Sequence, residues 1–376
     1  MDKIAIYPLT TTDDIDDVIS LCKEYEQANG HLPLNDQSWI ELHGSRDTST
    51  ANILIGYVVR NTQSNEIVAY LHLSAHTAGS TIEVVANSAL MGSEEIVERL
   101  IKRCLSDLEA DQYPLYLWVA SPDAYLSKVA ESLGMSKHRE LYQMRKPLTT
   151  GATSQADIED TRNKKHTTGT IDIGDTDIGD PATMVHKSAV GGTRSTRSDS
   201  KNKTIEDASG RILLFRTFQP GRDEASWLTL NNRCFAEHPD QANWTIDDLA
   251  ARENESWFDP KGFILCEYDG NLAGSCWTKI HSATGPDRQP AGEIYVICTN
   301  PEYQGSGIGK LLLQAGLNYF ERHSLPVAML YVESTNESAL ALYRHHGFSL
   351  HSITTQYVIN TRPNHLGVWC FSRLLA

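Results

Sequence analysis

The fold of this chain is decided by one short stretch, Gln304-Gly305-Ser306-Gly307-Ile308-Gly309-Lys310. It has the pattern Q-x-x-G-x-G, follows a run of strand-forming residues and opens a predicted helix over 307–322. Glycines allow consecutive backbone N–H groups to turn toward one point, and a helix N-terminus adds a favourable dipole. The stretch therefore predicts a cradle for a pyrophosphate group.

Two other nucleotide-binding loops fit this stretch less well. A P-loop would end in a lysine followed by Ser or Thr, whereas Lys310 is followed by leucine. A Rossmann loop would have an acidic ribose ligand about 20 residues further on, and none stands at the expected position. Both readings are disfavoured.

The flanking residues predict an α/β unit around the stretch. Residues 293–297 and 328–332 are predicted strands on either side of the 307–322 helix. Upstream, 263–268 and 272–278 are apolar runs joined through an Asp-Gly turn, which is a strong hairpin signal.

The first part of the chain repeats this order. Predicted strands at 53–59 and 67–73 form a hairpin, 81–85 leads into a helix at about 93–110, and 115–119 precedes another helix. The last helix of each copy is followed by a glycine, in Leu133-Gly134-Met135 and His346-Gly347-Phe348, where glycine suits a left-handed cap. We infer two tandem copies of one α/β unit.

A polar segment separates the copies. The chain has no Phe, Tyr or Trp between Tyr142 and Phe215, and Ser, Thr and Gly supply 25 of the 62 residues from 149 to 210. Such a segment buries too little apolar surface to offset the entropy of ordering. We predict an N-terminal domain at 1–148, a disordered linker at 149–210 and a C-terminal catalytic domain at 211–376. A segment that folds on a partner is the alternative for the linker.

Charge and composition narrow the function. Lys and Arg total 33 against 48 Asp and Glu, for a formal net charge of −15, which argues against general nucleic-acid binding. No apolar run of about 18 residues and no apolar leader is present, so we expect neither a membrane span nor secretion. Seven cysteines without a C-x-x-C pair suggest reduced thiols in the cytoplasm.

Two further segments complete the pattern around the glycine-rich stretch. Ile297-Cys298-Thr299-Asn300-Pro301 precedes it, and N-x-x-A-x-x-x-Y-x-x-x-G-F, from Asn336 to Phe348, follows it. In this order they resemble the GNAT superfamily of N-acetyltransferases. The resemblance implies two tandem GNAT folds, each a mixed twisted sheet flanked by helices, with acetyl-CoA as co-substrate.

The resemblance also implies how acetyl-CoA binds. Pantetheine would pair with the backbone before the stretch, the stretch would hold the pyrophosphate, and the following helix would lie beside the thioester. The implied cofactor-binding residues are Ile297, Cys298, Thr299, Gln304, Gly305, Ser306, Gly307, Ile308, Gly309, Lys310, Asn336, Glu337, Ser338, Ala339, Leu340 and Ala341.

Two side chains take catalytic roles under this resemblance. An ammonium nucleophile must lose a proton before it attacks a thioester, and Glu293 stands where the family places its general base. Tyr343 matches the general acid that protonates the departing CoA thiolate. The alternatives are an ordinary strand-end charge for Glu293 and a core tyrosine for Tyr343.

A narrower resemblance covers most of 211–376. Segments 234–241, 244–249 and 255–263 are similar to tandem-GNAT enzymes that acetylate the cysteinyl amine of Cys-GlcN-inositol. The resemblance implies that the acceptor is bound by Asp36, Asp240, Lys279, Glu293 and Tyr331. A solvated carboxylate is the alternative for Asp36, and a surface strand residue is the alternative for Lys279.

The first copy lacks an equivalent cradle. At the corresponding position stands Ala89-Leu90-Met91-Gly92-Ser93-Glu94-Glu95, with one glycine and two carboxylates that would repel a pyrophosphate. Acetyl-CoA binding by the first domain is therefore in doubt. No metal is expected, because neither His238 nor His281 has a second ligand at a suitable spacing, so both are interpreted as structural or solvated.

Two other functions stay open from the sequence. One is a GNAT enzyme that acetylates another small-molecule amine or a protein N-terminus, and the other is a non-catalytic sensor that binds acyl-CoA. A sensor has no need of a base, yet Glu293 and Tyr343 are both present. We expect a cytoplasmic monomer with a small-molecule substrate and no nucleic-acid or membrane partner.

Overall fold

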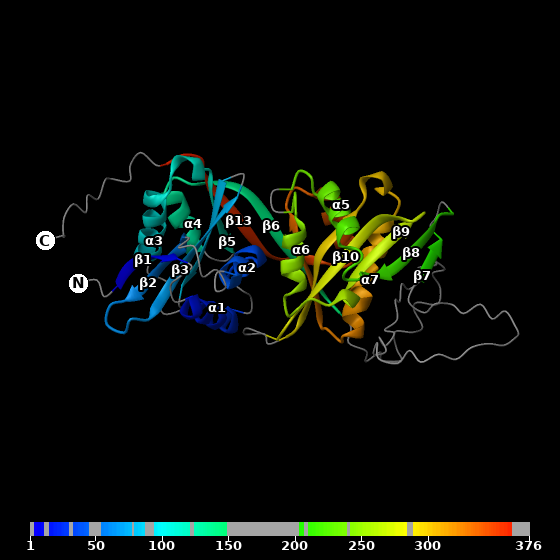
Figure 1. Ribbon diagram of the computed structural model, residues 1–376, viewed down its shortest axis with the longest axis horizontal. Coiled ribbons are helices and arrows are strands. Elements are labelled where there is room, and N and C mark those ends of the chain that lie inside the picture. The colour runs from blue at the N-terminus through cyan, green and yellow to red at the C-terminus, as the bar shows by residue number, and fades with distance from the viewer. Residues whose placement is uncertain are drawn as a thin grey trace, which may run out of the picture. The chain divides into compact units, whose positions relative to one another are not determined.

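The computed structural model describes residues 4–10, 15–29, 33–44, 54–76, 79–86, 94–120, 124–148, 203–206, 210–238, 241–283 and 289–362. The chain packs as two compact units (Figure 1). Unit 1 comprises Met1–Arg145, Ser282–Gln289 and Tyr331–Ala376, and unit 2 comprises Lys146–His281 and Pro290–Leu330. Residues 149–202 of the predicted linker lie outside the described residues.

Unit 1 is a mixed sheet with helices. Its strands follow the order β1-β2-β3-β4-β5-β13-β6. The elements are β1 (Ile4–Thr10), α1 (Ile15–Asn29), α2 (Asp36–Gly44), β2 (Leu54–Asn61), β3 (Ile67–His76), β4 (Gly79–Ala86), α3 (Glu94–Asp107), a 3-10 turn (Ala110–Gln112), β5 (Leu115–Ala120), α4 (Ala124–Ser132), β6 (Ser136–Pro147), α8 (Glu337–His345) and β13 (Ser349–Ile359). The predicted hairpin, strands and helices of the first copy are all present in it.

The last strand of the second sequence copy lies in unit 1. β13 pairs antiparallel with β5, from Thr354 opposite Ala120 to Ile359 opposite Leu115, and on its other side with β6. The compact units therefore do not coincide with the predicted domain limits, which describe the sequence copies.

Unit 2 repeats the arrangement with the strand order β12-β11-β10-β9-β8-β7. Its elements are β7 (Lys203–Glu206), β8 (Ile212–Thr217), α5 (Glu224–Cys234), α6 (Ile246–Glu253), β9 (Phe263–Tyr268), β10 (Asn271–His281), β11 (Ala291–Thr299), α7 (Ile308–Arg322) and the first part of β12 (Val327–Glu333), with 3-10 turns at Pro260–Gly262 and Pro301–Tyr303. The strand β7 corrects the linker prediction, since Lys203–Glu206 pairs antiparallel with β8. Only Ile205 of these four residues is apolar, so the composition of the segment gives no strand signal.

In both units two neighbouring parallel strands separate after a short ladder. In unit 2, β11 pairs with β12 from Ala291 opposite Val327 only as far as Ile294 opposite Leu330, although β11 runs on to Thr299. In unit 1, β4 pairs with β5 from Ser80 to Ile82 and runs on to Ala86. The second half of β11 is thus left with a backbone edge where a ligand can pair.

One face of β10 and β11 carries Lys279 and Glu293 together with an aromatic cluster of the unit 2 core. On the opposite face α7 packs closely, and a Cβ on Gly316 would lie 2.7 Å from Ile294 and 2.9 Å from the sulfur of Cys276. An aromatic cluster supports the polar face, where Trp277 stacks on Phe263 with ring centroids 4.4 Å apart. Both rings are completely buried.

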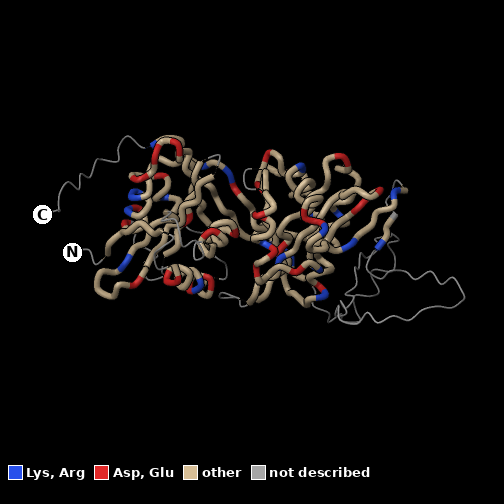
Figure 2. Tube along the Cα trace, in the orientation of Figure 1, with Lys and Arg blue, Asp and Glu red and all other residues tan. Residues whose placement is uncertain are grey.

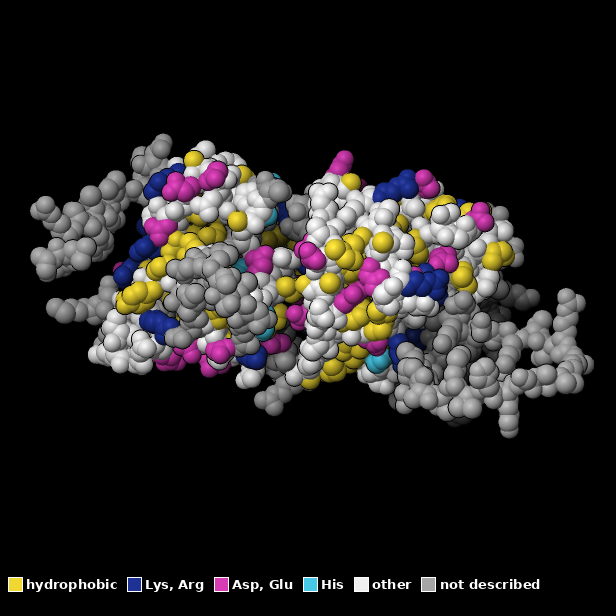
Figure 3. Space-filling model, viewed as in Figure 1, with side chains coloured by type: hydrophobic (Ala, Val, Ile, Leu, Met, Phe, Trp, Pro, Cys, Tyr) yellow, Lys and Arg dark blue, Asp and Glu magenta, His cyan; other side chains and the backbone are white. Residues whose placement is uncertain are grey.

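Charged side chains are spread over the surface. Acidic and basic residues are distributed along the chain in both units (Figure 2). The space-filling view likewise shows charges of both signs with smaller groups of hydrophobic side chains between them (Figure 3). Among the described residues, no helix is long and apolar enough to cross a membrane.

Candidate active site

The glycine-rich stretch forms an open turn at the start of α7. Gly305 and Gly307 have φ of +77° and +87°, and a Cβ at either position would meet no atom within 4 Å. Glycine is required here by the backbone conformation, since other residues rarely adopt these angles. Gly307 is the N-cap of α7, so no side chain caps the first turn and an anion has room to approach the helix N-terminus.

The predicted pantetheine-binding residues lie at the end of β11. Ile297, Cys298 and Thr299 pair with β10 on one side, beyond the point where the ladder with β12 ends. The Cys298 thiol is buried, 3.4 Å from the hydroxyl of Ser275. A hydrogen bond from Cys234 lowers the pKa of Cys298 against the effect of burial, and the Ser275 hydroxyl lowers it further.

Glu293 is buried at the start of β11 beside two basic side chains. It is 8% exposed and stands directly opposite Lys279 in the ladder between β10 and β11. The Nε2 atom of His281 lies 2.6 Å from Oε2 of Glu293. A buried carboxylate with a charge-compensating neighbourhood is suited to accept a proton from a cationic substrate.

Lys279 is also buried, which excludes the interpretation as a surface residue. It is 6% exposed, and its Nζ lies 4.6 Å from the ring centroid of Trp257 and 5.6 Å from that of Tyr295. Cation–π contacts hold a desolvated ammonium by about 2 kcal/mol. The hydroxyl of Tyr295 in turn accepts a hydrogen bond of 3.0 Å from Arg252. The ammonium is therefore held at a fixed place near the predicted base.

His281 was not predicted as part of the site. The alternation of a strand places residues 279 and 281 on the same face of β10, opposite the start of β11. That signal is present in the sequence, although its pattern predicts only a structural or solvated histidine at this position. Its side chain is 34% exposed, whereas that of Glu293 is 10% exposed.

The predicted helix beside the thioester is α8 of unit 1. Asn336 is its N-cap, and its side chain accepts a hydrogen bond of 3.1 Å from the Ala339 N–H. Tyr343 is 6% exposed, with its ring centroid 6.0 Å from that of Phe348. This burial agrees with a core tyrosine and leaves the acid role a prediction. Glu337, Ser338 and Ala341 are exposed, and Leu340 is buried.

Tyr331, predicted to bind the acceptor, is the most exposed tyrosine of the site. It is 42% exposed on β12, and its hydroxyl accepts a hydrogen bond of 2.6 Å from the amide of Gln143. The bond fixes the hydroxyl of a side chain that stays partly exposed to solvent.

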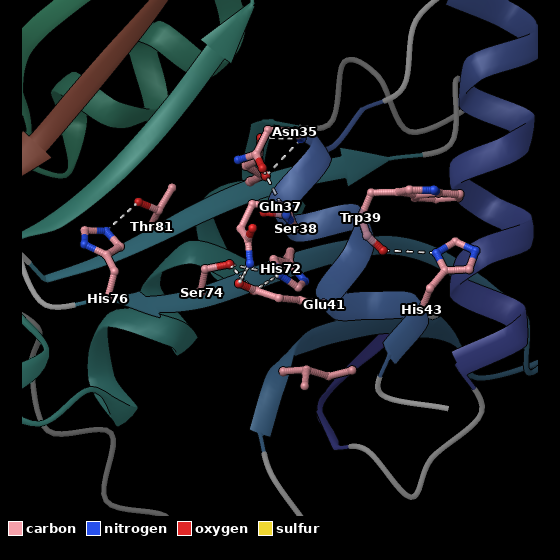
Figure 4. A network of polar contacts seen from close by, with 12 residues as sticks. Asn35, Gln37, Ser38, Trp39, Glu41, His43, His72, Ser74, His76 and Thr81 are labelled. Carbon is pink, nitrogen blue, oxygen red and sulfur yellow. Dashed lines mark hydrogen bonds and ion pairs between the residues drawn. The ribbon is translucent and has the colours of Figure 1, made fainter. Parts of the chain in front are cut away.

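Asp36 begins α2 in unit 1, and its neighbours Asn35, Gln37 and Ser38 belong to a polar network (Figure 4). Next to Asp36, the Asn35 N–H donates a hydrogen bond of 3.0 Å to the carboxylate of Glu83 on β4. The side-chain oxygen of Asn35 accepts a hydrogen bond of 2.9 Å from the Ser38 N–H. Burial raises the pKa of Glu83, although Ser38 and Asn35 donate to it. The network anchors the helix end that carries Asp36.

The same network extends along α2 to β3. Glu41 accepts from the Ser74 hydroxyl at 2.5 Å and lies 3.1 Å from Nε2 of His72. Burial alone would raise the pKa of Glu41, but hydrogen bonds from His72, Ser74 and Gln37 lower it. The polar side chains of His72 and Ser74 on β3 are thus hydrogen-bonded to Glu41 of α2.

Two predictions concern residues that the structure does not describe. Asp240, a predicted acceptor ligand, and residues 89–93 of the first copy's loop lie outside the described residues. Within the described ranges, no group of three or more His, Cys, Asp or Glu is placed to hold a metal ion.

Comparison with known proteins identifies relatives for nearly the whole chain. The acetyltransferase (GNAT) family model matches residues 225–348. The mycothiol acetyltransferase of Acidimicrobium ferrooxidans is 34% identical over 334 residues, which cover 88% of this chain and 89% of that protein. The mycothiol acetyltransferase of Thermomonospora curvata is 31% identical over 349 residues, covering 92% of this chain and 94% of that protein.

A solved structure supports the tandem fold. A tandem GNAT protein from the clavulanic acid biosynthesis pathway superposes with a TM-score of 0.53 at 13% identity, over 96% of this chain and 99% of that one. At this identity the similarity concerns the fold alone. The predicted α/β architecture of two tandem GNAT folds is confirmed.

Proposed function

This chain belongs to the mycothiol acetyltransferases, a family of tandem GNAT acyltransferases, and we propose that it acetylates the cysteinyl amine of Cys-GlcN-inositol with acetyl-CoA. This reaction is the last step of mycothiol biosynthesis. The observation that carries the proposal is the buried Glu293, opposite Lys279 and on the strand that leads to the open turn at Gly305 and Gly307.

Glu293 acts first, as the general base. The acceptor amine arrives as an ammonium, and the carboxylate takes one of its protons. The nitrogen lone pair then attacks the thioester carbonyl and the C–N bond forms. As the tetrahedral intermediate collapses, the C–S bond breaks and the nitrogen loses its second proton to water. Glu293 is protonated at the end and releases its proton to water, so no covalent enzyme intermediate is needed.

Tyr343 is proposed as the acid that protonates the departing CoA thiolate. The hydroxyl proton passes to sulfur, and the phenolate recovers a proton from solvent. The proposal rests on the N-x-x-A-x-x-x-Y spacing from Asn336.

The open turn is proposed to hold the pyrophosphate of acetyl-CoA. Its residues fit that group, because glycine at 305 and 307 leaves open space and exposes the N-terminus of α7. Lys310 in the first turn adds a positive charge. Pantetheine would extend from there along the open edge of β11.

Acceptor recognition is proposed to be polar. Lys279 offers a fixed ammonium to the hydroxyl groups of a sugar or an inositol, and Tyr331 offers an exposed ring. Asp36 and Asp240 complete the proposed set on the resemblance alone. A cytoplasmic location and a monomeric state likewise stay predictions.

Product analysis tests the function. Purified protein, acetyl-CoA and Cys-GlcN-inositol are incubated, and the product is identified by mass spectrometry and thiol titration. We expect an N-acetylated product that keeps its free thiol, and no product with GlcN-inositol, the matched control without the cysteinyl amine. Transfer to other amines at an equal kcat/KM would favour a GNAT enzyme of different specificity, and acetyl-CoA binding without transfer would favour a sensor.

A further inference from the structure

We propose that His281 is a positioning residue for Glu293, holding one carboxylate oxygen so that the other is presented to the acceptor amine. The inference rests on the proposed role of Glu293 as base. It assigns a function to a histidine that the sequence pattern left as structural or solvated.

The geometry of the pair is that of a strong hydrogen bond. Nε2 of His281 and Oε2 of Glu293 are 2.6 Å apart, slightly closer than the about 2.7–2.9 Å that is typical of a charge-assisted N–H···O bond. An ionised carboxylate only accepts, so the hydrogen of this bond lies on Nε2. The bond therefore engages Oε2 and leaves Oε1 for another donor.

The ladder between β10 and β11 explains why this histidine can reach. His281 stands opposite Ala291 in this antiparallel ladder. Lys279, two residues before His281 on β10, stands opposite Glu293, two residues after Ala291 on β11. Side chains two residues apart on a strand share a face, so His281, Lys279 and Glu293 lie on one face of the sheet. The imidazole approaches the carboxylate from the end of β10, diagonally across the pair of strands.

A carboxylate in this place needs such a partner. Glu293 is buried and stands directly opposite Lys279, its cross-strand neighbour, in the ladder between β10 and β11. The terminal torsion of a glutamate is broad, so burial alone does not fix which oxygen faces the substrate. The Nε2–H bond removes that freedom, and the contacts of Lys279 with Trp257 and Tyr295 hold the ammonium on their ring faces.

Unit 1 contains the same histidine geometry without the carboxylate. His76 ends β3 as His281 ends β10, and its Nε2 lies 3.0 Å from the hydroxyl of Thr81. Thr81 occupies the register position of Glu293, one residue before the last pair of the parallel ladder. Both units thus have a histidine at the end of this strand. His281 contacts a carboxylate, Glu293, whereas His76 contacts a hydroxyl, that of Thr81.

A double-mutant cycle on turnover tests the inference. His281→Phe keeps a ring of similar size but removes the N–H, and we expect kcat to fall about 10- to 100-fold with an unchanged KM for acetyl-CoA. His281→Gln restores an N–H donor and should recover most of the loss. In the Glu293→Gln background, His281→Phe should cause no further loss, because a residue that acts through Glu293 has nothing left to position.

The outcomes separate this inference from the proposed function. If Glu293→Gln turns over at the wild-type rate, the proposed base is wrong. If Glu293→Gln is impaired and His281→Phe is not, only the positioning role is overturned. Equal losses from His281→Phe in both backgrounds would also overturn it, since independent effects add. If the Phe variant fails to fold, His281→Ala with added imidazole replaces it, and absence of rescue counts against the inference.

Discussion

The two units carry nearly the same strand scaffold and differ in what stands on it. In unit 2 the ladder between β10 and β11 sets Lys279 opposite Glu293, and in unit 1 the ladder between β3 and β4 sets Ser74 opposite Thr81. Both pairs stand one residue before the point where the parallel strands separate. Two differences in sequence at equivalent register positions therefore give a charged pair in unit 2 and a neutral pair in unit 1.

The side chains around the two pairs also differ between the units. In unit 1 the Ser74 hydroxyl donates a hydrogen bond to Glu41 of α2, so a carboxylate from a neighbouring helix lies beside this pair. In unit 2 the ammonium of Lys279 lies over the aromatic rings of Trp257 and Tyr295. The pair in unit 2 therefore has aromatic rings beside it, whereas the pair in unit 1 has a carboxylate.

The largest expected effect is on kcat and comes from changing Glu293, the proposed base, whose position in unit 1 is held by Thr81. Glu293→Gln keeps the size of the side chain and its place opposite Lys279, but it cannot take a proton. We expect kcat to fall about 10²- to 10⁴-fold, the usual size of general acid–base assistance. Acetyl-CoA affinity, measured by calorimetry, should be unchanged, and a similar loss of both would point to misfolding instead.

The second effect concerns the open turn of unit 2. Gly307→Asp strains the backbone at a φ of +87° and adds a negative charge at the N-terminus of α7. We expect the KM for acetyl-CoA to rise by about 10- to 100-fold. The matched control is Gly270→Asp, since Gly270 has a φ of +77° and open space but lies in the turn between β9 and β10. Equal effects of the two variants would show that backbone strain alone is responsible.

A smaller effect tests the contrast between Lys279 in unit 2 and Ser74, which holds the equivalent register position in unit 1. Trp257→Leu removes the ring face 4.6 Å from the ammonium of Lys279 while keeping an apolar side chain. The acceptor KM should rise about 2- to 30-fold, with a smaller change for Trp257→Phe, since a cation–π contact is worth about 0.5–2 kcal/mol. An unchanged KM for both variants would show that Lys279 does not meet the acceptor.

The smallest effect is on stability and belongs to unit 1. Burial raises the pKa of Glu83, so the folded state binds its proton more tightly than the unfolded state. The stability that Glu83 contributes is therefore present below the ordinary pKa of glutamate and is lost as pH rises through the raised value. Glu83→Gln has no such dependence, and its melting temperature should gain a few degrees relative to wild type between pH 4.5 and pH 8. A constant difference across this range would contradict the raised pKa.

The sequence predicted the parts that depend on local pattern. The hairpin turn at Asp269 and Gly270, the helix α7 and the strands of both copies follow from alternation, turn residues and helical spacing. The placement of Glu293 and Gly307 on neighbouring elements followed from the motif order. These features are fixed by residues close in the chain.

The remaining features depend on contacts between distant segments. The pairing of β13 with β5 joins residues more than 200 positions apart and leaves no local signal. The burial of Lys279 depends on Trp257, which belongs to a separate segment. The contact of His281 with Glu293 could have been inferred from strand alternation, but only after the register of β10 and β11 was known.

The central claim is that the acetyl transfer depends on the pair in unit 2 and not on its counterpart in unit 1. The most direct measurement is the turnover of Thr81→Val, which removes the hydroxyl at the position equivalent to Glu293 without changing the size of the side chain. We predict a kcat within about twofold of wild type, as for a surface-like change away from the reacting atoms. A loss comparable to that of Glu293→Gln, in a variant that melts at the wild-type temperature, would contradict the claim.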